Sequence, residues 1–145
     1  MTIPSIRPGF YTVTPYIIVQ DIDALIDFVK QVFGATETLR LTGSAGGFHV
    51  EVSIGNSMMM LGGGGAWEGT PIPAALYVYV DDVDAVYQRA LQSGATTLME
   101  PTNESDGDRR GGVQDPFGNQ WFIATHIEDV STEEMTRRWA SMQQT

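Results

Sequence analysis

Cysteine is absent from this chain of 145 residues, which excludes disulfides, thiolate metal sites and a cysteine nucleophile. Basic residues are scarce: eight Lys and Arg oppose 18 Asp and Glu, for a net charge of −10. Nucleic-acid binding needs clustered basic side chains, so we expect no nucleic-acid partner. No apolar run reaches the roughly 18 residues of a membrane span. The first residues also lack the basic-then-apolar pattern of a signal peptide. We therefore expect no membrane partner and a cytoplasmic location.

What the chain does contain is an internal repeat. Four landmarks recur in the same order and at nearly the same spacing. They are an aromatic-containing apolar run, an acidic stretch, a Gly-Ala-Thr tripeptide and a Gly-Asn pair, at 16–18, 19–25, 34–36 and 55–56 and again at 76–79, 80–86, 94–96 and 118–119. Such a repeat indicates two copies of one supersecondary unit.

Each copy has the sequence features of four strands. Runs rich in β-branched and aromatic residues at 13–19 and 75–80 favour an opening strand. Three further strands are expected in each half, at about 36–42, 47–54 and 57–62, and at about 96–100, 109–114 and 119–126.

A helix is expected between the first and second strands of each copy. The aspartates at 21 and 23, and at 82 and 84, are suited to cap its N-terminus, because a carboxylate accepts hydrogen bonds from free first-turn N–H groups. Gly34 and Gly94 stand where a helix ends in a residue of positive φ. The fold class is therefore α+β, with two βαβββ modules.

The expected organisation is a single domain over 1–145. Module one covers about 10–62 and module two about 74–126. The intervening segment, 63–73, is rich in glycine and proline and is interpreted as a linker. Ser131 and Glu134 form a capping box, which predicts a C-terminal helix over about 131–142.

Two motifs in the second half carry a resemblance to a known family. Gly-Asp-Arg-Arg at 107–110 and Asp-Pro-Phe-Gly-Asn-Gln-Trp at 115–121, with Thr-Pro-Tyr at 14–16, resemble the vicinal oxygen chelate superfamily. This superfamily includes glyoxalase I, extradiol dioxygenases, and fosfomycin and bleomycin resistance proteins. The motifs are most similar to its demethylubiquinone-methyltransferase-like or glyoxalase-like branch. The resemblance covers about 10–130, and it implies a homodimer whose paired modules form a curved mixed sheet around a cleft.

The same resemblance locates the metal ligands of the family. They correspond to Thr14, Met59, Ala75 and Phe122. A threonine hydroxyl is a poor metal anchor, and the other three side chains lack a nitrogen or oxygen donor. We therefore expect no metal and no cofactor. A displaced two-histidine, one-carboxylate site from His49, Glu51 and His126 is the alternative, but the histidines lie in different halves, which favours structural or exposed roles.

If the family's ligand positions face a cleft, their neighbours at i±2 face it too. The candidate ligand-binding residues are Thr14, Tyr16, His49, Glu51, Met59, Leu61, Trp67, Tyr77 and Phe122. An apolar and aromatic lining with few polar groups is typical of a small-molecule pocket; the alternative is an ordinary packed core. His49 and Glu51 are also candidates for acid–base catalysis. We further expect Asp108 to pair with Arg109, and Asp115 to shape its turn.

Three functions are compatible with this pattern. The first is a metal-free protein that binds or sequesters a small, cationic or aromatic molecule, similar to bleomycin resistance proteins. The second is a glyoxalase-like lyase, isomerase or dioxygenase-type enzyme with a displaced metal site or metal-free acid–base chemistry. The third is a scaffold domain without a ligand. The negative charge, the aromatic lining and the missing ligands favour the first.

Overall fold

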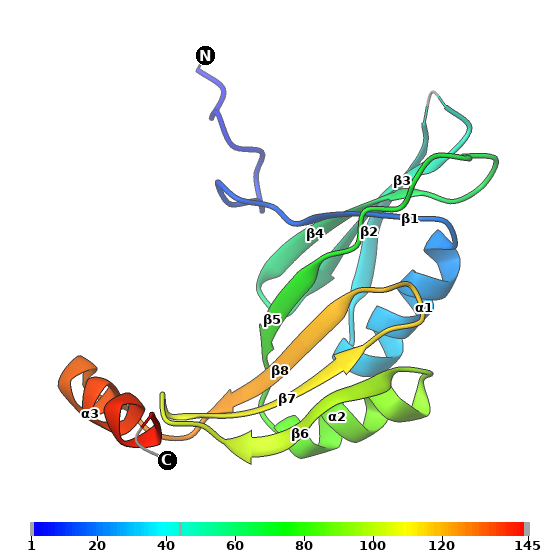
Figure 1. Cartoon of the computed structure of the whole chain (residues 1–145). Helices are drawn as coiled ribbons and strands as arrows, with labels where there is room; N and C mark the ends of the chain where they lie inside the picture. Colours follow the sequence, from blue (N-terminus) through cyan, green and yellow to red (C-terminus); the bar gives the residue numbers. More distant parts are fainter. Residues whose placement is uncertain (1, 44, 144–145) are drawn as a thin grey trace. The chain divides into compact units, whose positions relative to one another are not determined.

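The computed structural model describes residues 2–43 and 45–143. The chain divides into two compact units, Met1–Ala74 and Ala75–Thr145. Each unit contains one four-stranded mixed sheet (Figure 1). Within the described residues, no helix is both long and apolar enough to cross a bilayer.

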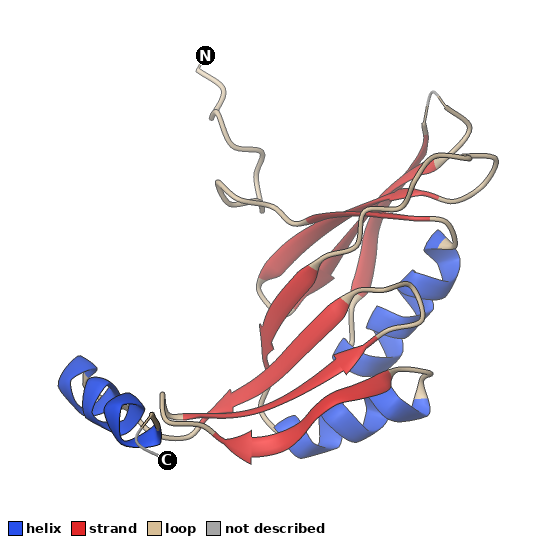
Figure 2. Ribbon diagram, in the orientation of Figure 1, coloured by secondary structure: helices blue, strands red, loops and turns tan. Residues whose placement is uncertain are grey.

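The first unit is a βαβββ module. Its elements are β1 (Tyr16–Val19), α1 (Ile22–Phe33), β2 (Thr36–Thr42), β3 (Phe48–Ile54) and β4 (Ser57–Gly63), with strand order β1-β4-β3-β2. β1 runs parallel to β4, and the other neighbours are antiparallel. Helix α1 packs against one face of this sheet (Figure 2).

The second unit repeats this order and adds a helix. Its elements are β5 (Ala75–Tyr79), α2 (Val83–Gln92), β6 (Thr96–Asn103), β7 (Asp108–Gln114), β8 (Gln120–His126) and α3 (Thr132–Met142), with strand order β5-β8-β7-β6. The α+β class, the duplicated βαβββ module and the C-terminal helix are thus confirmed.

Short local signals place the helices. The Asp21 and Asp82 carboxylates accept hydrogen bonds from the N–H groups of Ala24 and Ala85, each at 3.1 Å. Helix α1 then ends at Gly34, whose φ of 67° is accessible to glycine without a Cβ clash. Its buried face consists of Ile22, Leu25, Ile26, Phe28, Val29 and Val32.

The turn between β7 and β8 is organised by one buried carboxylate. Asp115 accepts hydrogen bonds from the backbone N–H groups of Phe117 and Asn119, each at 2.9 Å. It also accepts one from the Asn119 amide, at 2.9 Å, and one from the Trp121 indole, at 2.8 Å. The prediction that Asp115 shapes this turn is confirmed, and the same carboxylate orients Trp121 in the core.

The glycine-rich segment is partly a strand. Gly63, predicted to begin the linker, belongs to β4, where it pairs with Val19 of β1. The Cβ of a larger residue there would lie 2.0 Å from the Val19 carbonyl oxygen, and φ is 111°. The glycine therefore marks a close approach of two strands, which composition alone does not distinguish from a loop.

Candidate functional site

The sheet face opposite α1 carries the polar candidates of the first unit. Tyr16 of β1 pairs with Met60 of β4, and Met60 pairs with Glu51 of β3. Residues that pair directly share a sheet face, and His49 joins them because it is two residues from Glu51. The rings of Tyr16 and His49 lie 5.9 Å apart. The structure therefore brings Tyr16, His49 and Glu51 together, as predicted, and we call the face that holds them the Glu51 face.

Glu51 is the unusual residue of this face, since its side chain is a carboxylate with only 2% of its residue surface exposed. It accepts a hydrogen bond from His49 Nε2 at 3.0 Å and forms an ion pair with the guanidinium of Arg7. Burial raises the pKa of Glu51, but the hydrogen bonds from His49 and Arg7 outweigh it, so the pKa lies below its ordinary value. The face thus holds a buried negative charge at neutral pH.

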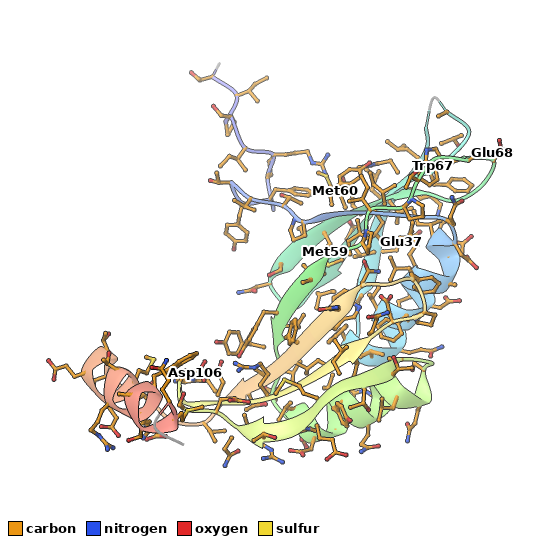
Figure 3. The ribbon with its side chains drawn as sticks, viewed as in Figure 1. Glu37, Met59, Met60, Trp67, Glu68 and Asp106 are labelled. Carbon is orange, nitrogen blue, oxygen red and sulfur yellow. The ribbon has the colours of Figure 1, made fainter. Side chains whose placement is uncertain are left out.

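Met59 and Leu61, predicted to lie beside Tyr16, are on the opposite face. Both are buried with the core, at 4% and 0% exposure, and Met60 takes the place predicted for Met59 (Figure 3 labels both methionines). Thr14 precedes β1 and is half-buried.

Met59 and Leu61 were assigned to the wrong face because the two β-hairpin turns of the repeat differ in length. The β3–β4 hairpin turns through Gly55 and Asn56 alone, whereas five residues, 115–119, separate β7 from β8. Tyr16 therefore pairs with the fifth residue after Gly55, while Tyr77 pairs with Phe122, the fourth after Gly118. A slip of one residue moves each side chain of a strand to the other face.

Trp67 lies in the loop that follows β4 and is half-buried. It packs against glycine backbone of its own unit. A Cβ built on Gly69 would lie 2.2 Å from Trp67 Cζ2, and one built on Gly63 would lie 3.3 Å from Trp67 Cε3. The loop is therefore fastened beside the end of β4, with the indole as its anchor.

A second polar cluster occupies the second unit, where it is centred on Asp108 of β7. This carboxylate, 4% exposed, accepts hydrogen bonds from the hydroxyls of Tyr77 and Tyr79, at 2.5 and 2.8 Å, and from His126 Nδ1, at 2.8 Å. Arg110 Nη1 donates to the Tyr77 oxygen at 3.1 Å. Burial and the bond to Asp108 raise the pKa of Tyr77 to about 12.

Most of this cluster was missed by the sequence candidates, which included Tyr77, Phe122 and His126 but not Asp108, Tyr79 or Arg110. Tyr77 and Phe122 do share one face of the sheet. The expected Asp108–Arg109 pair is wrong, because adjacent strand residues point to opposite faces. Arg109 instead binds both carboxylate oxygens of Asp84, at 2.8 and 2.9 Å. The sequence did offer one indication of this cluster: Tyr77 and Tyr79 are two residues apart in a strand, so their hydroxyls lie on the same face.

The donors at the family's metal positions do not suit a divalent cation. Thr14, Ala75 and Phe122 stand at three of these positions, as expected from the sequence. Met60 stands at the fourth, where Met59 was expected, so this position still offers only a thioether. Within 2–43 and 45–143, no group of three or more His, Asp or Glu side chains is placed to hold a metal. His126 has both ring nitrogens hydrogen-bonded, to Asp108 and, at 2.7 Å, to Asp129.

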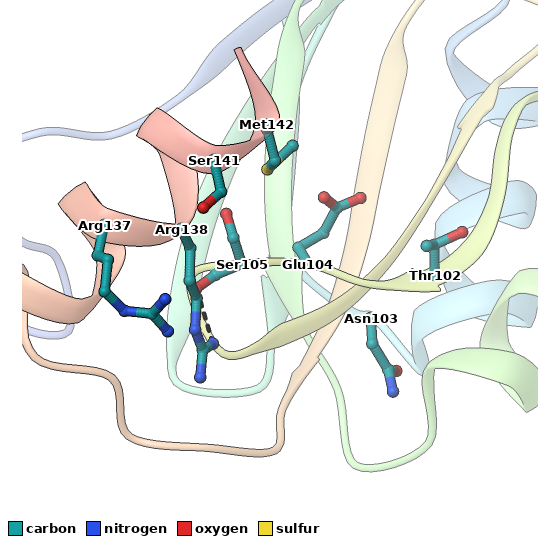
Figure 4. Close-up of a pocket in the computed structure, with 8 residues that line it drawn as sticks. All are labelled: Thr102, Asn103, Glu104, Ser105, Arg137, Arg138, Ser141 and Met142. Atoms are coloured by element: carbon teal, nitrogen blue, oxygen red, sulfur yellow. Dashed lines mark hydrogen bonds between the residues drawn. The ribbon is translucent and has the colours of Figure 1, made fainter. Parts of the chain in front are cut away.

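An open groove of about 530 Å³ lies beside α3 in the second unit (Figure 4). Its lining comes from the end of β6 with the following turn and from α3; the residues are Thr102, Asn103, Glu104, Ser105, Arg137, Arg138, Ser141 and Met142. Arg138 donates to the Ser105 carbonyl at 3.1 Å and pairs with Glu128 and Glu134. Arg137 also pairs with Glu134. Carboxylates of the same unit therefore neutralise both arginines.

These features define a class of protein with a duplicated βαβββ fold and one polar cluster on each sheet. The model of the Glyoxalase/Bleomycin resistance protein/Dioxygenase superfamily matches residues 9–123, and the chain belongs to this superfamily. It is 32% identical over 139 residues to an uncharacterized protein of Mycobacterium bovis, a match that covers 88% of this chain and 91% of that protein.

Solved structures show the same fold. TioX from Micromonospora sp. ML1 matches with a TM-score of 0.61 and 22% identity, over 79% of this chain and 99% of that one. Lactoylglutathione lyase from Agrobacterium tumefaciens matches with a TM-score of 0.60 and 20% identity, over 82% and 96%. At these identities the likeness concerns the fold alone.

Proposed function

We propose that this protein binds a small aromatic or cationic molecule on the Glu51 face and holds it without chemical change. The observation that carries the proposal is the buried, ionised Glu51 carboxylate on a face with aromatic and thioether side chains. A buried charge is costly unless it is paired, and Glu51 takes its partners from Arg7 and His49. The face therefore already accepts a cationic group, which supports a ligand of that charge. Half-buried Met60 adds a flexible, polarisable contact for an apolar ligand frame.

The test uses the two neighbouring methionines as reporters. Protein labelled with ¹³C at the methionine methyl groups is titrated with a panel of aromatic cations, neutral aromatics and aromatic acids. We expect a saturable shift of the Met60 methyl with little change at Met59, which lies on the opposite face, and unchanged ligand in solution. No shift of Met60 with any compound at millimolar concentration would refute the proposal.

An acid–base enzyme is the second candidate, favoured by the His49–Glu51 hydrogen bond of 3.0 Å. It predicts conversion of a compound from the same panel. Glu51→Gln and His49→Ala would then abolish turnover while leaving the protein folded. Binding without turnover in the unaltered protein, over hours at high enzyme concentration, counts against it.

We also propose a cytoplasmic location, which the sequence led us to expect, and a homodimer, which the family resemblance implies. Light scattering after size-exclusion chromatography tests the second point. A mass of twice the 15.8 kDa chain supports the homodimer, and a mass of one chain contradicts it.

A further inference from the structure

The Glu51 carboxylate already has a cationic partner from its own chain. Arg7 lies in the segment 2–15, which contains neither helix nor strand among its described residues. Its guanidinium pairs with Glu51 and lies over the ring of Phe10, 4.1 Å from the centroid. A guanidinium stacked on an aromatic ring and paired with a buried carboxylate has the contacts of a bound ligand.

The two partners differ in how they are held. The Glu51 side chain is 3% exposed and sits in the middle of β3, whereas the Arg7 side chain is 53% exposed. Displacing Arg7 therefore leaves the sheet intact and releases a segment without regular structure. The conformational entropy regained by that segment favours the exchange, while the lost ion pair opposes it.

The groups around the carboxylate indicate what could replace Arg7. Glu51 offers two oxygens, one of which accepts from His49 and the other from Arg7. The neighbouring side chains are apolar or aromatic: Leu39 and Met60 pair with Glu51 on the adjacent strands, and Tyr16 pairs with Met60. A planar nitrogen cation on an aromatic frame satisfies both features, because its N–H groups meet the carboxylate and its frame meets the apolar surface.

Resting on the function proposed above, we propose that the Glu51 face selects guanidinium or amidinium compounds, and that Arg7 occupies this site as an internal competitor. An internal ligand reduces the apparent affinity of an external one by the fraction of molecules in which the site is free. Removal of Arg7 should therefore strengthen binding, although it deletes no contact with the external ligand.

The experiment is calorimetric titration with benzamidine, a planar aromatic amidinium, and with benzamide, its neutral counterpart. The variants are Arg7→Ala and, as the matched control, Arg40→Ala. Arg40 belongs to the same unit and pairs with Asp23 and Glu37, so both variants lower the net charge by one. We expect Arg7→Ala to bind benzamidine at least tenfold more tightly than both the unaltered protein and Arg40→Ala. Benzamide should bind weakly to all three.

Glu51→Gln in the Arg7→Ala background should return benzamidine to the weak binding of benzamide, with circular dichroism to verify folding. If that double variant does not fold, the two single variants and the two ligands still decide the matter. Equal affinity of Arg7→Ala and Arg40→Ala for benzamidine, or equal affinity of Arg7→Ala for the two ligands, would overturn the inference.

The methionine reporter separates this failure from failure of the proposed function. A Met60 shift caused by another compound class, with none from benzamidine in Arg7→Ala, refutes the internal-competitor inference and leaves the binding function standing. No Met60 shift with any compound, in either the unaltered protein or Arg7→Ala, refutes both.

Discussion

Three acidic side chains, those of Glu51, Asp108 and Asp115, are almost completely buried in the described part of the chain. Each accepts at least two hydrogen bonds from other side chains: Glu51 from Arg7 and His49, Asp108 from two tyrosines and His126, and Asp115 from Asn119 and Trp121. Burial of a carboxylate is unfavourable without such partners. Three of the 18 acidic residues are thus held in specific hydrogen-bond networks.

Asp115 provides the clearest test at this scale. Asp115→Ala removes the acceptor for four donors around the β7–β8 turn, so we expect a loss of about 2–4 kcal/mol in the free energy of unfolding. The comparison is Asp21→Ala, which removes an exposed helix cap and should cost about 1 kcal/mol. Urea denaturation of both variants measures the difference; equal losses would show that the buried network adds nothing beyond a cap.

We expect His126 to make the stability of the folded protein depend on pH. Its hydrogen bonds to Asp108 and then to Asp129 raise its pKa above the ordinary value. A raised pKa means that the folded state favours the protonated ring, so the stabilisation is complete below the unfolded-state pKa and is lost as pH rises through the folded-state pKa.

We therefore expect an NMR titration midpoint for His126 above about 6.5, and a lower midpoint in Asp129→Asn. The stability difference between the unaltered protein and His126→Asn should shrink between pH 6 and pH 9. A midpoint below that of a free histidine would contradict the assignment.

At the scale of elements, strand pairing depends on small residues at particular positions. Gly55 and Gly63 both have positive φ, of 55° and 111°. A Cβ on Gly55 would meet open space, whereas one on Gly63 would collide with the Val19 carbonyl at 2.0 Å. The first glycine shapes a hairpin turn, and the second lets β1 and β4 approach.

These two glycines form a matched pair of substitutions. Gly55→Ala should cost about 1 kcal/mol, from the backbone conformation alone. Gly63→Ala should cost about 3 kcal/mol or more, because backbone atoms must also move. Thermal unfolding, followed by circular dichroism, tests the order; a smaller loss for Gly63→Ala would mean that β1 can separate from β4 at low cost.

For the whole molecule, the donor chemistry predicts behaviour that is independent of metal. We expect elemental analysis of tag-free protein to show far less than one metal per chain, both as purified and after incubation with Zn²⁺, Mn²⁺, Fe²⁺ or Ni²⁺. A chelator should leave the melting temperature unchanged. Removal of a bound structural metal would lower it, and we expect no such metal to be present. A stoichiometric, chelator-sensitive metal would contradict this expectation.

The order of the elements, the helix caps at Asp21 and Asp82, the Asp115 turn and the superfamily could all be predicted from the amino-acid sequence. These features depend on neighbours close in the chain or on a repeated pattern, which a single sequence displays. The position of Met60, rather than Met59, beside Tyr16 required the three-dimensional structure, since a one-residue difference between two turns reverses a strand's faces. The same is true of the partners of Asp108 and of the ion pair between Arg7 and Glu51, which are 44 residues apart. Such contacts depend on strand register and on the path of the chain, and no pattern of neighbouring residues predicts them.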